Sequence, residues 1–176
     1  MTTFVLIPGM CHGGWCFREL CEELRHHGHR AVALTLTGLA ERAHLLDGGV
    51  NLDTHIRDVA GVLEAEDVRD AVLVGHSYGG MVITGVADRL PGRMAGLVYL
   101  DVASLLQPLR LTGDPARIAR RVYVYAAGWQ GESPFTATYE RLREDPAWTT
   151  YALDGGHNLM RDAPEDLLKI LAGTRW

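Results

Sequence analysis

The chain has 176 residues, of which 47% are hydrophobic and 22% are charged, and its formal net charge is -5. This length and balance predict a single globular domain over residues 1–176, with a hydrophobic core. The negative charge argues against nucleic acid or an anionic membrane as the main partner. No apolar run is long enough to span a membrane, and no leader-like segment precedes Phe4, so we expect a cytoplasmic protein.

Short apolar runs alternate with amphipathic patterns along the whole chain. An unbroken apolar run of this kind predicts a strand buried on both faces, and apolar residues at i, i+3, i+4 and i+7 predict a helix. The alternation predicts an α/β fold with a mostly parallel six-stranded sheet and helices on both faces. The expected strands are 4–7, 31–36, 71–74, 97–100, 122–125 and 149–153, and the expected helices are 17–27, 52–63, 82–90, 115–120, 135–142 and one that begins near Pro164.

Cofactor and metal motifs are missing from the sequence. The three cysteines, Cys11, Cys16 and Cys21, are five residues apart, which turns them to different faces of a helix and favours free, reduced thiols. The glycine-rich segment 9–14 lacks the dinucleotide-binding spacing, and no Gly-Lys-Ser/Thr sequence is present. We therefore expect neither a cofactor nor a metal ion.

The sequence Gly75-His76-Ser77-Tyr78-Gly79 follows directly on the apolar run 71–74 and precedes a helical pattern. A serine between two glycines, at a sharp turn from strand to helix, is the nucleophile elbow of α/β-hydrolases. The alternative is a glycine-rich loop with a capping serine. Strand, turn and helix together favour Ser77 as a nucleophile.

A serine nucleophile needs a base, and in a parallel sheet reacting groups gather at the carboxyl ends of the strands. Asp101 and His157 both follow directly after an expected strand, as Ser77 does, whereas the other histidines lie inside the elbow, in a loop or at helix ends. We predict His157 as the general base and Asp101 as the acid. Glu132 and, less strongly, Asp154 remain alternatives for the acid.

The reaction also requires two backbone N–H groups that stabilise a developing oxyanion. One is expected from Tyr78, the residue after the nucleophile, and the other from Met10 in the loop after the first strand, with Cys11 as the second choice. The neighbouring Gly9, Cys11 and His12 are then expected to contact the substrate.

Three parts of the sequence together resemble one branch of the α/β-hydrolases: segment 4–15, segment 36–42, and the elbow 75–81 combined with Gly155-Gly156-His157. This branch contains the plant methylesterases, the hydroxynitrile lyases and bacterial esterases. The resemblance implies an α/β-hydrolase fold with Ser77 as nucleophile, His157 as base, and the N–H groups of Met10 and Tyr78 as the oxyanion hole.

The chain departs from this pattern in three ways. Ala127 stands at the usual acid position of the plant members, which is why we assign the acid to Asp101. Hydroxynitrile lyases have a threonine at the position of Gly9 and a lysine at that of Asn158, so both residues favour ester hydrolysis. The helical cap that family members insert between 102 and 121 is absent.

We predict a serine carboxylesterase that acts on small, short-acyl esters through an acyl-enzyme on Ser77. The alternatives are a catalytically weak or inactive ligand-binding scaffold and a hydroxynitrile lyase-type lyase. Loss of the cap would also expose Leu105, Leu106 and Leu109, which predicts a homodimer.

Overall fold

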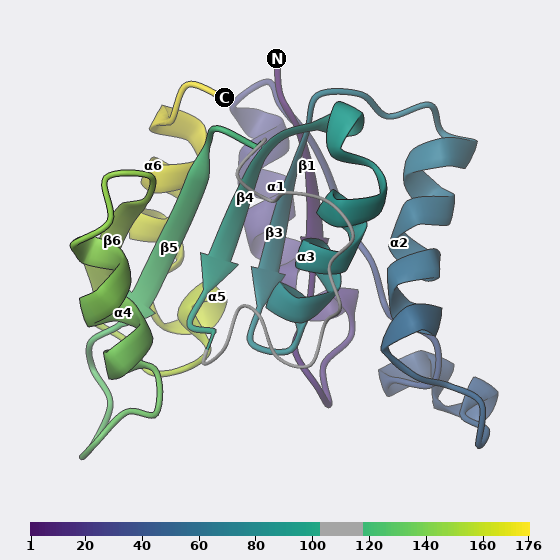
Figure 1. The fold of residues 1–176 in the computed structure, drawn as a ribbon, viewed down its shortest axis with the longest axis horizontal. Coiled ribbons are helices and arrows are strands. Elements are labelled where there is room, and N and C mark those ends of the chain that lie inside the picture. Colours follow the sequence, from purple (N-terminus) through teal and green to yellow (C-terminus); the bar gives the residue numbers. More distant parts are fainter. Residues whose placement is uncertain (103–117) are drawn as a thin grey trace.

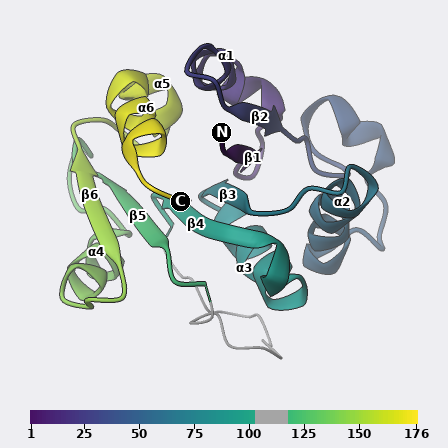
Figure 2. The ribbon, with the colours of Figure 1, turned by 90° about the horizontal axis from the view of Figure 1, so that it is seen from above.

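The computed structural model describes residues 1–102 and 118–176, and these form a sheet of six parallel strands between two layers of helices (Figures 1 and 2). The strand order is β2-β1-β3-β4-β5-β6, and every neighbouring pair is parallel. The strands are β1 (Thr3–Ile7), β2 (Arg30–Ala33), β3 (Ala71–His76), β4 (Met94–Leu100), β5 (Arg121–Ala126) and β6 (Thr149–Leu153). The predicted α/β class and the helices on both faces are confirmed.

Successive residues of the strands supply two separate cores, because side chains alternate between the faces of a sheet. In β3, all of whose residues are buried, Leu73 packs in one core and Val72 and Val74 pack in the other. Figure 2 shows α1, α5 and α6 over one face of the sheet and α2, α3 and α4 over the other. The helices are α1 (Arg18–His26), α2 (Leu52–Ala65), α3 (Gly79–Arg89), α4 (Thr136–Arg143), α5 (Leu159–Asp162) and α6 (Pro164–Gly173), with 3-10 turns η1 (Gly14–Phe17), η2 (Ala40–Leu45) and η3 (Pro91–Arg93).

The register of the central strands brings two predicted site residues to one edge of the sheet. His76 at the end of β3 pairs with Leu100 at the end of β4. Ser77 and Asp101 are therefore the first residues beyond the same rung of the ladder. In parallel sheets this carboxyl-terminal edge is where ligands bind.

Two local predictions differ from the structure. The strand expected over 31–36 ends at Ala33, because the carbonyl of Thr35 accepts a hydrogen bond from the Arg42 side chain and its hydroxyl accepts one from the Gly14 N–H. These bonds turn the chain away from the sheet. The helix expected over 115–120 lies partly outside the described residues, and residues 118–120 are not helical.

The chain passes from β4 to β5 through residues 101–120, a stretch too short for a cap domain. The cap is therefore absent, as the sequence predicts. The apolar residues Leu105, Leu106 and Leu109, on which the homodimer prediction depends, lie outside the described residues. Within residues 1–102 and 118–176, no helix combines the length and the apolar character needed to cross a membrane.

Candidate active site

Ser77 lies at the sharp turn between β3 and α3, with its backbone in the left-handed region at a φ of 50°. Its N–H donates to the carbonyl of Leu100 at 3.0 Å, and its carbonyl accepts from the N–H of Gly80 at 3.0 Å. A Cβ added to Gly75 would lie 2.6 Å from the carbonyl oxygen of Gly79, so the turn closes only with glycine at position 75. Ser77 therefore has a strained backbone conformation that non-glycine residues rarely adopt.

Asp101 follows β4 and is completely buried, with a φ of 49°. Its carboxylate accepts three hydrogen bonds. Oδ1 accepts from the N–H of Ala126 at 3.2 Å, while Oδ2 accepts from Trp129 Nε1 at 3.1 Å and from His157 Nδ1 at 2.7 Å. A buried carboxylate needs such donors to replace the water it has lost.

The bond to Asp101 fixes the protonation pattern of His157. Because Nδ1 carries the ring proton and donates a hydrogen bond to the carboxylate, the Nε2 atom of the neutral ring has a free lone pair. That is the state required of a general base. The side chain of His157 is 28% exposed, so the ring remains open to a substrate.

Three aromatic rings surround the imidazole of His157. Phe135 stacks on it with ring centroids 4.9 Å apart and an interplanar angle of 4°. Trp129 lies 5.8 Å and His76 lies 4.5 Å from it. The sequence alone gives neither Trp129 nor Phe135 a role at the site: Trp129 stands in a segment without a carboxylate, and Phe135 fits the expected helix over 135–142.

His76 lies against the imidazole of His157 and donates a hydrogen bond to the His157 backbone. It is 1% exposed, and its Nε2–H donates to the carbonyl of His157 at 2.8 Å, while its Nδ1 has no partner among the described residues. Burial, reinforced by the neighbouring His157 and His12, lowers the pKa of His76 to about 3. His76 is therefore neutral at physiological pH and serves as a hydrogen-bond donor.

The loop after β1 lies against the elbow. A Cβ added to Gly9 would lie 3.0 Å from Cβ of Ser77, so the glycine permits a close approach. The loop turns back on itself through a bond from the His12 N–H to the Gly9 carbonyl at 3.3 Å, with Cys11 at a φ of 65°. His12 Nδ1–H also donates to the carbonyl of Met10 at 3.1 Å.

Two backbone N–H groups at the elbow are available to a substrate. Those of Met10 and Tyr78 take part in no hydrogen bond within residues 1–102 and 118–176. The side chain of Met10 is 53% exposed, whereas that of Tyr78 is held in place by the protein. Free N–H groups on two converging segments are the arrangement that an oxyanion hole requires.

The side chain of Tyr78 is fixed by His55, a buried histidine on α2. His55 Nε2–H donates to the carbonyl of Thr37 at 2.8 Å, so its Nδ1 accepts from the Tyr78 hydroxyl at 2.7 Å. Burial raises the pKa of Tyr78 to about 12, which keeps the hydroxyl protonated. His55 lies in the first turn of α2, at a helix end as expected, but it is only 5% exposed, and nothing in the sequence indicated this burial.

The structure thus brings Asp101 and His157 into direct contact and places Ser77 on the adjacent strand end. No hydrogen bond joins Ser77 Oγ to His157 among the described residues; such catalytic contacts often tighten only when substrate binds. The alternative acids, Glu132 and Asp154, are exposed and make no hydrogen bond or ion pair with His157 in this part of the chain. Within the same described ranges, no group of three His, Cys, Asp or Glu side chains is arranged to hold a metal ion.

Comparison with known proteins places the chain in a family. The profile of the alpha/beta hydrolase family matches residues 4–172, so the chain belongs to this family. A carbendazim hydrolyzing esterase of Nocardioides sp. (strain SG-4G) is 34% identical over a 240-residue alignment that covers 98% of this chain and 99% of the relative. The alignment is longer than this chain, so the relative carries residues that this chain lacks. The predicted family is confirmed.

Other similar proteins include a further esterase and a solved structure with the same fold. Esterase PIR7B of Oryza sativa subsp. japonica is 31% identical over 102 residues, which cover 57% of this chain and 38% of the rice protein. The crystal structure of the Arabidopsis methylesterase MES16 superposes with a TM-score of 0.77 at 19% identity, covering 97% of each chain, and shows the shared fold. The esterase relatives support a serine esterase, which confirms the predicted class of carboxylic ester hydrolase.

Proposed function

We propose that Ser77, His157 and Asp101 form the catalytic triad of a carboxylesterase that acts on small esters with short acyl chains. The observation that carries this proposal is the 2.7 Å bond between His157 Nδ1 and Asp101 Oδ2, at the sheet edge where Ser77 occupies its strained turn. The bond leaves Nε2 of His157 free to accept a proton. Small-molecule esters as substrates agree with the esterase relatives.

In the proposed mechanism, Ser77 Oγ attacks the ester carbonyl carbon while its proton passes to His157 Nε2. The carbonyl oxygen becomes an oxyanion, which accepts hydrogen bonds from the N–H groups of Met10 and Tyr78. When the tetrahedral intermediate collapses, the bond between carbon and the leaving oxygen breaks, and that oxygen takes the proton from His157. An acyl group then remains on Ser77.

Water completes the cycle. His157 accepts a proton from a water molecule as the water oxygen attacks the acyl carbon, and the second intermediate expels Ser77 Oγ, which regains a proton from His157. Asp101 stays charged throughout and stabilises the imidazolium that forms twice in each turnover. Gly9, Cys11 and His12 border the substrate, and the missing cap leaves an open site with broad, weak selectivity.

A fluorophosphonate probe tests the nucleophile, because it forms a covalent bond with an activated serine. We expect labelling of the wild type and of Ser133→Ala, which removes a different, half-buried serine, and no labelling of Ser77→Ala. Equal labelling of Ser77→Ala would sink the proposal. Labelling without turnover of any activated ester would instead favour a ligand-binding scaffold, and release of cyanide from a cyanohydrin would favour a lyase.

We also propose that residues 1–176 form one domain and that the protein is cytoplasmic. We further propose that it forms a homodimer through Leu105, Leu106 and Leu109, between β4 and β5. Sedimentation velocity over a range of concentrations tests the assembly. We expect a dimer at high concentration that weakens in the triple variant Leu105→Ser, Leu106→Ser, Leu109→Ser. A monomer at every concentration would contradict it.

A further inference from the structure

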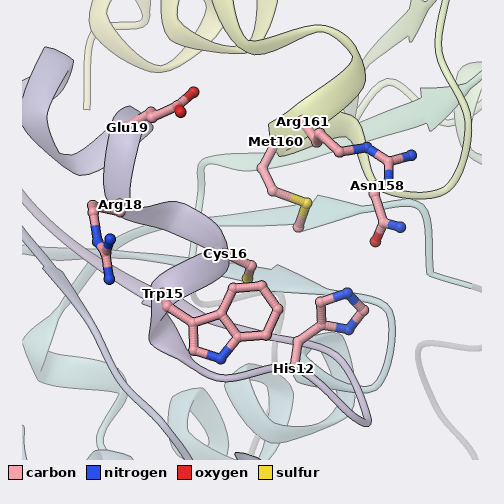
Figure 3. Close-up of a pocket in the computed structure, with 8 residues that line it drawn as sticks. All are labelled: His12, Trp15, Cys16, Arg18, Glu19, Asn158, Met160 and Arg161. Carbon is pink, nitrogen blue, oxygen red and sulfur yellow. The ribbon is translucent and has the colours of Figure 1, made fainter.

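A cavity of about 350 Å³ lies beside the proposed triad, between η1 and the start of α1 on one side and α5 on the other (Figure 3). It is a separate space, since neither Ser77 nor His157 lines it. It adjoins them through two of its own residues: His12 belongs to the oxyanion loop, and Asn158 directly follows His157. The lining residues are His12, Trp15, Cys16, Arg18, Glu19, Asn158, Met160 and Arg161.

One wall of this cavity is aromatic, and Met160 supplies an apolar surface on the side opposite. The rings of His12 and Trp15 lie next to each other in Figure 3, with centroids 5.7 Å apart and an interplanar angle of 33°. Trp15 is 53% exposed and lines the cavity, so its ring is accessible to a ligand there. The buried thioether of Met160 faces it, and burial raises the pKa of Cys16 to about 12, so that this thiol is neutral. A flat ring fits between such walls.

Two acceptor atoms at the cavity lack a donor. Asn158 makes no side-chain hydrogen bond among the described residues, and its Oδ1 is buried without a partner. Such an atom destabilises the folded state by about 1–3 kcal/mol unless a donor reaches it. Because His12 Nδ1–H donates to the Met10 carbonyl, its Nε2 is a second free acceptor in the neutral ring. A ligand with an O–H or N–H group would satisfy these atoms.

The charged side chains at the rim do not select a charged ligand. Arg161 pairs with Asp162 at 2.8 Å, and Arg18 and Glu19 carry opposite charges on adjacent residues. The formal charges of these two arginines and two carboxylates therefore sum to zero. The walls and acceptors together describe a neutral, planar aromatic group that carries a hydrogen-bond donor.

The position of the cavity indicates which part of a substrate it receives. The leaving oxygen must lie within reach of His157 Nε2 to take its proton, so the leaving group must extend along a side of that histidine. Phe135 and Trp129 occupy other sides. The ring of His12, which lines the cavity, is 6.0 Å from the ring of His76, and the ring of His76 is 4.5 Å from that of His157. Seen from His157, the cavity therefore lies just beyond the rings of His76 and His12.

We propose that this cavity binds the leaving-group side of the ester, as a neutral aromatic alcohol that carries a further O–H or N–H donor. The proposal rests on the proposed esterase function. The acyl group then lies elsewhere, over the open edge of the sheet. The donor on the ring reaches Asn158 Oδ1, and the ring covers Trp15.

Three acetate esters with the same acyl group test the proposal: 3-hydroxyphenyl, 3-methoxyphenyl and methyl acetate. They form one common acetyl-enzyme, so differences in kcat/KM report the leaving group alone. We expect Asn158→Ala to abolish a roughly tenfold preference for the 3-hydroxy over the 3-methoxy ester, the size of one hydrogen bond. Trp15→Ala should lower kcat/KM about tenfold for both aryl esters but leave methyl acetate unchanged, and Trp15→Phe should restore most of it.

Leu46→Ala is the matched control, because Leu46 is 63% exposed and does not line the cavity. We expect its ratios among the three esters to equal those of the wild type. Unchanged ratios in Asn158→Ala and in Trp15→Ala would overturn the proposal, since both substitutions remove walls of the proposed site.

A binding experiment without catalysis separates this inference from the esterase proposal. Resorcinol titrated into Ser77→Ala protein should shift the Trp15 indole N–H resonance, and 1,3-dimethoxybenzene, which lacks donors, should shift it far less. Binding of resorcinol without turnover of any ester would support the site and contradict the esterase. Turnover without any response of the Trp15 resonance to resorcinol would contradict the site alone.

Discussion

Ser77 and Asp101 both leave a central strand with a positive φ, at 50° and 49°. Each such conformation destabilises a non-glycine residue by about 1–3 kcal/mol and persists only where neighbouring structure enforces it. Here the ladder between β3 and β4 enforces both, because His76 and Leu100 pair directly before the two turns. The shared strain points both side chains out of the ladder at the same edge of the sheet.

Replacement of Asp101 by asparagine is the sharpest test at the scale of one residue. All three partners of the carboxylate are N–H donors, so an amide NH2 group in either orientation would face at least one of them. With the NH2 group at the Oδ2 position, His157 would accept a hydrogen bond at Nδ1, carry its proton on Nε2 and lose the lone pair that faces the substrate. We expect kcat to fall by about 10⁴ while the protein stays folded, as measured by initial rates and circular dichroism.

Glu132→Gln provides the control for this substitution, because Glu132 is the other carboxylate that the sequence offers. We expect its rate to match that of the wild type. The reverse pattern, a normal rate in Asp101→Asn and a large loss in Glu132→Gln, would move the acid to Glu132.

At the scale of elements, the segment that joins β5 to α4 holds the imidazole of His157 in place. Trp129 Nε1–H donates to the same Asp101 oxygen as His157, and Phe135 lies parallel to the imidazole. Together they fix the ring from its edge and its face.

Trp129→Phe keeps an aromatic ring but deletes the N–H bond to Asp101. We expect kcat to fall about tenfold with KM unchanged, because a lost bond to a charged group loosens the His157–Asp101 pair without touching substrate. Phe135→Leu should have a similar effect through loss of the stack. Tyr139→Leu, which removes the stack between Tyr139 of α4 and Tyr125 of β5, should leave kcat near the wild-type value. Equal losses in all three variants would indicate general destabilisation instead.

The elements themselves were largely predictable from sequence. Unbroken apolar runs identify strands buried on both faces, and the Asn51 cap of α2 is visible as a polar residue ahead of an apolar face. Trp129, Phe135 and His55 were missed, because their roles depend on contacts between distant segments. A tryptophan whose indole reaches a carboxylate 28 residues away leaves no periodic signal in the sequence. The end of β2 was missed for the same reason, since a side chain of the next turn competes for its backbone.

At the scale of the whole molecule, the site lies at the carboxyl-terminal edge of the sheet that separates the two cores. His76 lies at this edge, buried and neutral, with the carbonyl of His157 as its acceptor. The free energy of unfolding therefore depends on the protonation of this buried imidazole. An unfolded chain takes up a proton on this histidine near its ordinary pKa of about 6.5, whereas the folded chain resists until about pH 3.

The sign of the resulting pH dependence follows from proton uptake. Between about pH 6.5 and pH 3 the unfolded state binds one more proton than the folded state, so the free energy of unfolding falls as the pH falls. The contribution is fully present above pH 6.5. At pH 4 about 3 kcal/mol of it is lost, because each unit of pKa difference corresponds to about 1.4 kcal/mol.

His76→Gln isolates this contribution, because glutamine retains an N–H donor for the His157 carbonyl and does not titrate. We expect the variant to be less stable than the wild type at pH 7 but to lose about 3 kcal/mol less between pH 7 and pH 4, as measured by urea denaturation at each pH. His44→Gln, at an exposed position of η2, should keep the wild-type pH dependence. A parallel fall in stability for His76→Gln and the wild type would mean that other groups carry the acid sensitivity.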